Sequence, residues 1–173
     1  MIDGYDNATV IKKGQTFCVR NATPVSWKQE GFLRKFYMTY AEPKVAMPEI
    51  TSAEGGIVIL DAAKKMGKLD STEPLVVNGE IPLQREHIFF TNDAKNMLAG
   101  MWDSGALESE MRPFPWYEFV QMLEGAVTIT EEDGTPHIFK AGDAFFVPKG
   151  TVCSWKIDRY VKKFYAILDL SSD

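Results

Sequence analysis

The side chains best suited to chemistry in this 173-residue sequence lie between Trp102 and Tyr165. A carboxylate, Glu118, occurs there with a guanidinium group, Arg112, and a thiol, Cys153, among many aromatic residues. If the rings line the open end of a barrel, they form an apolar pocket in which Glu118 and Arg112 orient a small ligand. The predicted pocket consists of Glu118, Arg112, Trp102, Phe114, Trp116, Cys153, Trp155 and Tyr165.

Glu118 has two interpretations. It is either an acid/base or ligand-orienting carboxylate inside the barrel, or a buried glutamate paired with Arg112 or a backbone donor. The second is favoured, because a buried charge needs a partner in any case.

Cys153 is one of only two cysteines, with Cys18. It could act as a nucleophile, but no histidine lies near it in the sequence, so a small buried apolar residue is the preferred interpretation. His137 follows a turn and His87 lies in an entry strand, and both are expected at the surface or at a sheet edge. No catalytic residue is assigned.

Short alternating apolar segments, broken by turn residues, indicate the elements that position these side chains. The segments are 118–123, 126–130, 137–139, 144–147 and 164–168. Asp133-Gly134 between two of them predicts a hairpin, because both central residues of a type I′ turn need positive φ. The fold class is therefore all-β, a barrel or sandwich.

The chain also contains an internal repeat. Residues 12–37 align with 140–165 at a constant offset of 128, and 11 of the 26 positions are identical, including Trp27 with Trp155. We interpret this as a duplication. The same offset places Glu118 and Gly125 before residue 1, so the first copy corresponds to only half a unit.

A proline- and glycine-rich connector lies between the copies, with possible short strands at 57–60 and 75–77 and one helical turn at 62–65. The predicted domains are a half unit at 1–40, the connector at 41–81 and a complete barrel at 82–173.

Two groups of residues resemble the cupin motifs. Glu118 and Gly125 match the end of the first motif, and Gly142, Pro148 and Gly150 match the second. With Trp155 and the Lys-Phe-Tyr ending, the sequence resembles the two-cupin members of the ureidoglycine aminohydrolase-like branch, over residues 82–170 and, as a half unit, 8–40. This resemblance implies a cupin jelly-roll barrel with a partial second cupin unit at the N-terminus.

Cupin enzymes typically hold a divalent metal with two histidines and a glutamate from the first motif and a histidine from the second. Here the first two histidine slots contain Met111 and Pro113, or Arg112 and Phe114, depending on the gap chosen. The second-motif slot contains Cys153, and its counterpart in the first copy is Val25. A carboxylate with one thiol is a poor ligand set, so neither a metal nor another cofactor is expected.

Composition limits the classes of partner that the protein is expected to bind. The formal charge of −5 and the pI near 5.1 argue against binding the nucleic-acid backbone. No apolar run approaches the length of a membrane helix, and no signal peptide is recognised. We expect a soluble, cytoplasmic protein that associates with neither nucleic acid nor membrane.

Three functions remain open: a metal-free cupin that binds a small molecule, an enzyme acting on a small nitrogen-rich amino or ureido acid, or a structural dimerisation module. The missing ligands count against the enzyme. About 40 residues cannot bury enough surface to fold alone. The half unit could be covered by strand 57–60, by the complete barrel or by a second molecule. A homodimer with help from 57–60 is favoured, because similar cupins commonly dimerise.

Overall fold

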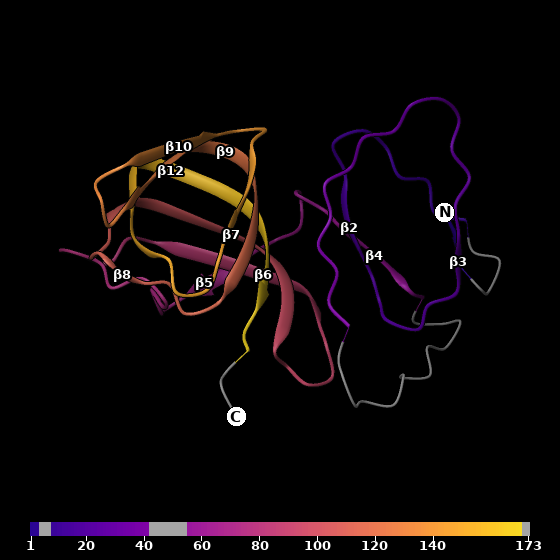
Figure 1. The fold of residues 1–173 in the computed structure, drawn as a ribbon, viewed down its shortest axis with the longest axis horizontal. Coiled ribbons are helices and arrows are strands. Elements are labelled where there is room, and N and C mark those ends of the chain that lie inside the picture. Colours follow the sequence, from indigo (N-terminus) through magenta and orange to yellow (C-terminus); the bar gives the residue numbers. More distant parts are fainter. Residues whose placement is uncertain (4–7, 42–54, 171–173) are drawn as a thin grey trace. The chain divides into compact units, whose positions relative to one another are not determined.

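The described residues, 1–3, 8–41 and 55–170 of a computed structural model, form strands and turns and contain no helix (Figure 1). This confirms the all-β prediction. In this part of the chain, therefore, no helix could cross a membrane. The chain divides into two compact units, Met1–Asp61 and Ala62–Asp173.

The second unit is built on one eight-stranded sheet in the order β10-β9-β12-β7-β6-β5, with β11 paired to β9 and β8 paired to β12. The two longest strands, β9 and β12, pair with each other, and β12 also pairs with β7. Its strands are β5 (Gly67–Leu69), β6 (Gln84–Thr91), β7 (Met97–Glu108), β8 (Arg112–Pro113), β9 (Tyr117–Glu131), β10 (Pro136–Lys140), β11 (Ala144–Val147) and β12 (Val152–Leu168).

Alternation along β9 and β12 determines which side chains enter the barrel. Glu118, Val120 and Met122 are buried at every second position of β9 while their neighbours are more exposed. On β12, Trp155, Lys163 and Tyr165 are buried as well, and Phe164 between the last two is also buried. The two strands therefore deliver aromatic and charged groups to one interior.

A buried carboxylate, Asp103 on β7, connects strands on both sides of it. Its oxygens accept hydrogen bonds from Arg85 on β6, at 3.1 Å from Nε and 2.6 Å from Nη2, and from the Tyr160 hydroxyl on β12 at 3.0 Å. Burial and the bond to Asp103 raise the pKa of Tyr160 to about 12, so the phenol is a stable donor at neutral pH. This group links β6, β7 and β12 where the β12–β7 register shifts.

The first unit contains β1 (Ile2–Asp3), β2 (Thr16–Val19), β3 (Val25–Ser26) and β4 (Ile57–Leu60). β1 pairs with β3, and β2 pairs with β4. The predicted strand at 57–60 is confirmed. The predicted strand at 75–77 is reduced to one bridge between Val77 and Ser109, and residues 62–65 form a turn without a helical segment.

The connector predicted at 41–81 is divided between the two units. β4 belongs to the first unit and β5 to the second, and residues 42–54 lie outside the described ones. Proline and glycine content indicates irregular backbone, but it does not indicate which neighbour the backbone packs against.

Contacts within the first unit repeat those of the second at the 128-residue offset. The β1–β3 register, Ile2 with Ser26, corresponds to the β9–β12 register of Thr130 with Ser154. The rings of Phe17 and Trp27 lie 6.1 Å apart at 56°. Their counterparts Phe145 and Trp155 also lie 6.1 Å apart, at 50°.

The lysine of the repeated Lys-Phe-Tyr run also has the same surroundings in each copy. Lys35 Nζ lies 4.4 Å from the Trp27 ring centroid, and Lys163 Nζ lies 4.6 Å from that of Trp155. The two tryptophans therefore have equivalent neighbours. They differ in exposure, because Trp27 is 47% exposed and Trp155 only 2%.

Gly125 of β9 lies where two strand backbones of the barrel wall approach closely, so its substitution tests how much that packing contributes to stability. Its φ is +75°, and a Cβ there would lie 1.9 Å from the backbone oxygen of Tyr160. We predict that Gly125→Ala lowers the free energy of unfolding by about 3 kcal/mol or more, because the strand backbones would have to move apart. Chemical denaturation measures this.

Gly134 in the β9–β10 turn is the matched control. Its φ is +87°, but nothing lies within 4 Å of its added Cβ. Gly134→Ala should therefore cost only about 1 kcal/mol, from backbone strain alone. Equal losses in both variants would show that the close approach of Gly125 to Tyr160 does not limit stability.

Candidate functional site

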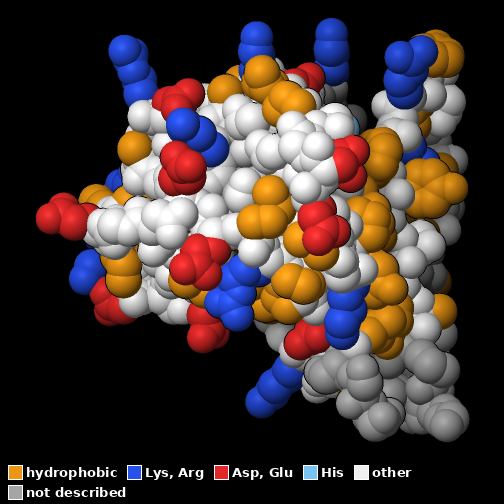
Figure 2. All heavy atoms as spheres, turned by 60° about the vertical axis from the view of Figure 1, so that its left-hand side comes forward, with side chains coloured by type: hydrophobic (Ala, Val, Ile, Leu, Met, Phe, Trp, Pro, Cys, Tyr) orange, Lys and Arg blue, Asp and Glu red, His pale blue; other side chains and the backbone are white. Residues whose placement is uncertain are grey.

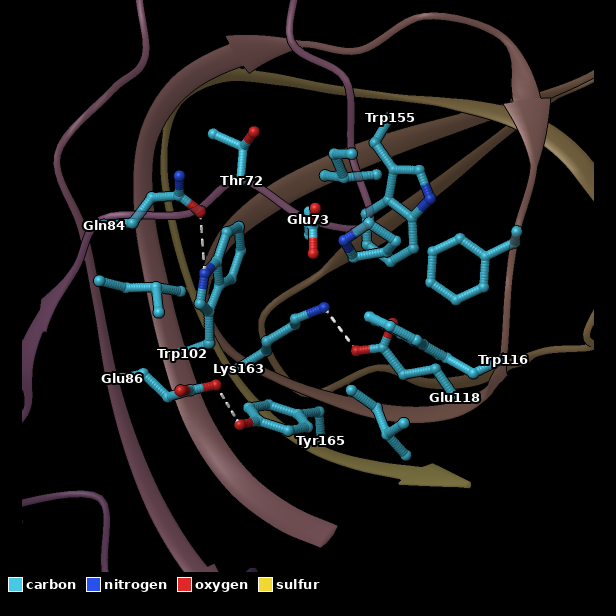
Figure 3. Close-up of a pocket in the computed structure, with 15 residues that line it drawn as sticks. Thr72, Glu73, Gln84, Glu86, Trp102, Trp116, Glu118, Trp155, Lys163 and Tyr165 are labelled. Carbon is cyan, nitrogen blue, oxygen red and sulfur yellow. Dashed lines mark hydrogen bonds and ion pairs between the residues drawn. The ribbon is translucent and has the colours of Figure 1, made fainter. Parts of the chain in front are cut away.

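The second unit contains a cavity of about 70 Å³. Its walls are aromatic, and Figure 3 shows the polar groups reaching in among the rings. The segment before β6 closes one side. The lining residues are Leu69, Thr72, Glu73, Pro74, Leu75, Gln84, Glu86, Trp102, Phe114, Trp116, Glu118, Trp155, Lys163, Tyr165 and Ile167.

A buried ion pair occupies the middle of this site. Lys163 Nζ on β12 lies 2.7 Å from Glu118 Oε1 on β9, and their side chains are 10% and 4% exposed. Both residues occupy inward positions of neighbouring strands, so the barrel interior brings them together. Each charge is the partner of the other, which offsets part of the large cost of burying either one alone.

Three rings surround the same ammonium group. Lys163 Nζ lies 5.0 Å from the ring centroid of Trp102, 4.6 Å from that of Trp155 and 5.9 Å from that of Tyr165. Aromatic faces attract a cation at these distances. The site is therefore an aromatic cage for a positive charge, and the protein fills it with its own lysine.

Two of the cage rings are held by hydrogen bonds that they donate to side chains of β6. The Trp102 indole N–H donates to Gln84 Oε1 at 3.1 Å, and the Tyr165 hydroxyl donates to Glu86 Oε1. Burial, with the hydrogen bond and negative charge of Glu86, raises the pKa of Tyr165. Tyr165 is therefore a neutral phenol at physiological pH and can donate but does not act as a base.

Three lining residues carry a further donor that has no acceptor. Gln84 Nε2, Trp116 Nε1 and Trp155 Nε1 are buried without a hydrogen-bond partner among the described residues. A buried donor without an acceptor costs about 1–3 kcal/mol. The site therefore offers hydrogen bonds that an oxygen-bearing ligand or water would complete.

Six of the eight predicted pocket residues line the cavity: Glu118, Trp102, Phe114, Trp116, Trp155 and Tyr165. Arg112 and Cys153 do not line this cavity, and both line a separate hollow of about 10 Å³. Arg112 is exposed because β8 has only two residues, paired with the start of β12. Glu118 is buried as predicted, but its partner is Lys163 rather than Arg112.

Neither thiol is activated. Both cysteines are free. Burial raises the pKa of Cys153, and burial raises that of Cys18 to about 11. Neither histidine lines the cavity, since His137 bonds to Glu131 in the exposed β9–β10 hairpin and His87 packs edge-on against Phe89.

Lys163, Gln84 and Glu86 were not among the predicted pocket residues. Lys163 could have been found from the repeat, because it lies two residues before Tyr165 and so shares its face of the strand. Gln84 and Glu86 belong to no recognisable motif in the sequence. Their role depends on the pairing of β6 with β7, which places Glu86 opposite Trp102.

The residues present do not fit a divalent metal ion. Among the described residues no three His, Cys, Asp or Glu side chains are grouped as ligands. The carboxylate of Glu118 is bonded to an ammonium group, and like charge would repel a metal ion placed beside Lys163. These side chains therefore do not provide the ligand set that a divalent metal needs.

We predict that Glu118→Gln and Lys163→Met each lower the free energy of unfolding by about 3–5 kcal/mol, because each leaves an unpaired buried charge. The double variant should lose less than the sum of the two. Denaturant unfolding of all four proteins measures the coupling.

The exposed pair of Lys156 and Glu108, 3.4 Å apart with side chains 55% and 59% exposed, is the matched control. Lys156→Met should cost less than about 1 kcal/mol. Strictly additive losses at Glu118 and Lys163 would contradict the buried pair.

Comparison with known proteins shows which family this barrel resembles. Residues 91–165 match the EutQ-like cupin domain. The chain is 33% identical over 127 residues to the acetate kinase EutQ of Salmonella typhimurium, covering 68% of this chain and 49% of that protein. It thus spans about half the length of the curated relatives it matches.

Solved structures agree with the fold. A protein of unknown function from Pseudomonas syringae pv. tomato has a TM-score of 0.61 and 31% identity, over 66% of this chain and 48% of that one. A putative ethanolamine utilization protein Q from Salmonella typhimurium has a TM-score of 0.53 and 25% identity, over 70% and 93%. The second unit of this chain is a cupin domain, and through it the chain belongs to the cupin superfamily.

Proposed function

We propose that the second unit is a metal-independent cupin that binds a compact polar molecule in the cavity around Lys163. The observation that carries the proposal is the buried Lys163–Glu118 pair, which places a fixed charge pair in an aromatic cavity with open donors. Such a cavity, mostly apolar with a few convergent polar groups, is typical of a small-molecule site.

The charges favour a ligand without net charge. Lys163 is neutralised by Glu118, while Glu86 and Glu73 add negative charge to the wall, which opposes a free anion. An added cation would meet the ammonium of Lys163. A neutral or zwitterionic molecule avoids both repulsions.

The open hydrogen-bonding groups define the ligand further. Gln84 Nε2 and Trp116 Nε1 need an acceptor, and the oxygens of Glu73 and Glu86 can accept from N–H or O–H groups. The volume admits roughly five water-sized groups at about 10–15 Å³ each. Small amides, ureas and amino alcohols have this combination of size, acceptor and donor.

A second candidate, the enzyme acting on a ureido or amino acid that the sequence resemblance implies, uses the same cavity. Ureido compounds carry the acceptor and donors described above, which is the observation in its favour. Hydrolysis would release ammonia, so an ammonia assay on each compound that binds distinguishes turnover from binding.

We predict that a panel of small amides, ureas and amino alcohols contains a compound that raises the melting temperature of the protein. Binding to the native state alone adds about 2.7 kcal/mol at a hundredfold excess over Kd. Carboxylates and divalent metal salts form the comparison groups. A divalent metal that raises the melting temperature would contradict the proposal. So would a panel in which no neutral compound raises it.

Two variants distinguish binding in the cavity from binding elsewhere on the protein. Trp116→Phe removes one open donor and should weaken binding, by calorimetry, about tenfold, as expected for a lost hydrogen bond of about 1–1.5 kcal/mol. Lys156→Met, at an exposed position that does not line the cavity, should leave the affinity unchanged. Equal affinities in all three proteins would place the ligand elsewhere.

A further inference from the structure

Among the described residues that line the cavity of the second unit, only Lys163 carries an amine. Its side chain is 10% exposed, and its Nζ lies 2.7 Å from Glu118 Oε1. Figure 3 shows this group extending from β12 in among the rings. A buried lysine of this kind can serve as a nucleophile, because an amine attacks carbon only after it has lost a proton and its hydration shell.

Lysines at the surface lack this environment. Figure 2 shows Lys and Arg side chains projecting into solvent on the face drawn, and the side chain of Lys156 is 55% exposed. An ammonium group in water is strongly hydrated and has no free electron pair with which to attack a carbon atom. The exposed lysines therefore provide the background against which the reactivity of Lys163 can be measured.

Glu118 is placed to accept the proton that Lys163 must lose. The two groups are at hydrogen-bond distance inside a wall that is largely aromatic. There the preference for an ion pair over a neutral amine and a neutral carboxylic acid is smaller than in water, because both charges have lost their hydration. Transfer of a proton from Nζ to Glu118 therefore yields a neutral nucleophile and leaves no unpaired charge in the interior.

The cage also suits the product of an attack on a carbonyl group. An amine and an aldehyde or ketone condense to a protonated imine, which carries the same single positive charge as the original lysine. The rings of Trp102 and Trp155, with centroids 5.0 and 4.6 Å from Nζ, attract that charge. Glu118 remains its counterion, so the reaction buries no new charge.

The open donors of the wall fit the oxygen atom of the carbonyl group. Gln84 Nε2, Trp116 Nε1 and Trp155 Nε1 are buried without an acceptor among the described residues. A carbonyl or hydroxyl oxygen accepts hydrogen bonds of this kind. The cavity of about 70 Å³ limits the compound to a short chain, and its aromatic wall restricts the access of water that would hydrolyse an imine.

We propose that Lys163 condenses with the carbonyl group of a short-chain aldehyde or ketone, with Glu118 transferring the protons. This inference rests on the proposed function, because it names a ligand class and a reaction for the same cavity. Lys163 is then a catalytic residue that binds the compound covalently.

The protons balance through Glu118. Nζ gives a proton to Glu118 and forms a bond to the carbonyl carbon, while the π electron pair moves to the oxygen, which takes the proton back from Glu118. Glu118 then removes a second proton from the nitrogen and passes it to the hydroxyl group as the carbon–oxygen bond breaks. Water leaves, and the nitrogen electron pair completes the protonated imine beside the Glu118 carboxylate.

The repeat provides a comparison lysine in the first unit. Lys35, the counterpart of Lys163, has its Nζ 4.4 Å from the ring centroid of Trp27. In the register of the repeat, however, β4 places Ile57 where β9 has Glu118. Lys35 is exposed, and among the described residues it contacts rings and no acidic group. It therefore has aromatic neighbours without the anion.

Reductive trapping of the full chain tests the condensation. Propanal is the probe, and sodium cyanoborohydride reduces any imine to a propylamine that peptide mapping by mass spectrometry locates. Lys163 should be labelled at least about tenfold faster than Lys35 and Lys156, because general acid–base catalysis typically contributes more than this. Propanamide, whose carbonyl group does not condense with amines, should slow the labelling of Lys163 and leave that of Lys156 unchanged.

Two variants test the roles assigned to the neighbours of Lys163. Glu118→Gln removes the proton transfer and should slow the labelling of Lys163 about a hundredfold, with circular dichroism showing that the protein is folded. Trp116→Phe leaves the ion pair in place and removes one donor to the carbonyl oxygen. It should slow labelling about tenfold, and it provides the test if Glu118→Gln does not fold.

The outcomes distinguish this inference from the proposed function. Labelling of Lys163 no faster than that of Lys156 would overturn the inference, and a neutral compound that still raised the melting temperature would leave the proposed function intact. An unchanged rate at Lys163 in the folded variants would also overturn the inference. Selective labelling of Lys163 without stabilisation by any neutral compound would support the condensation and contradict the proposed reversible binding.

Discussion

The buried pair of Lys163 and Glu118 is the constraint on which the second unit depends. A charge in an aromatic interior is stable only with a partner at hydrogen-bond distance, so β9 and β12 must keep a register that joins these two groups. The same register positions Trp155 and Tyr165 around the ammonium. Barrel closure, cage geometry and cavity chemistry therefore follow from one contact.

Much of this arrangement could be predicted from sequence, because strand alternation and motif glycines specify which residues face inward. Glu118 and the aromatic residues were found in this way. Lys163 was missed because a lysine in a strand usually extends to solvent, and only its spacing from Tyr165 contradicts that. Arg112 does not line the cavity, and the sequence does not indicate this, because Pro113 and Pro115 interrupt the alternation that would relate it to buried Phe114.

The first unit shows how register can be kept when a strand is replaced. The β2–β4 ladder repeats the β11–β9 ladder, yet its residues come from a segment that follows β3 in the sequence rather than preceding it. The replacing strand β4 is apolar at all four positions, Ile57–Leu60. It does not restore the anion, because Ile57 satisfies the apolar requirement of the position and lacks a carboxylate.

The central place of β12 has a consequence for biosynthesis. This strand joins β7 to β9, and its last residue pairs with Met97, far back in the sequence. Ladders between such distant residues form slowly, because the intervening chain must first be ordered. During translation β7 and β9 therefore emerge with open edges, and the barrel closes only after β12 has left the ribosome. Until then the nascent chain exposes apolar strands, the state that chaperones recognise.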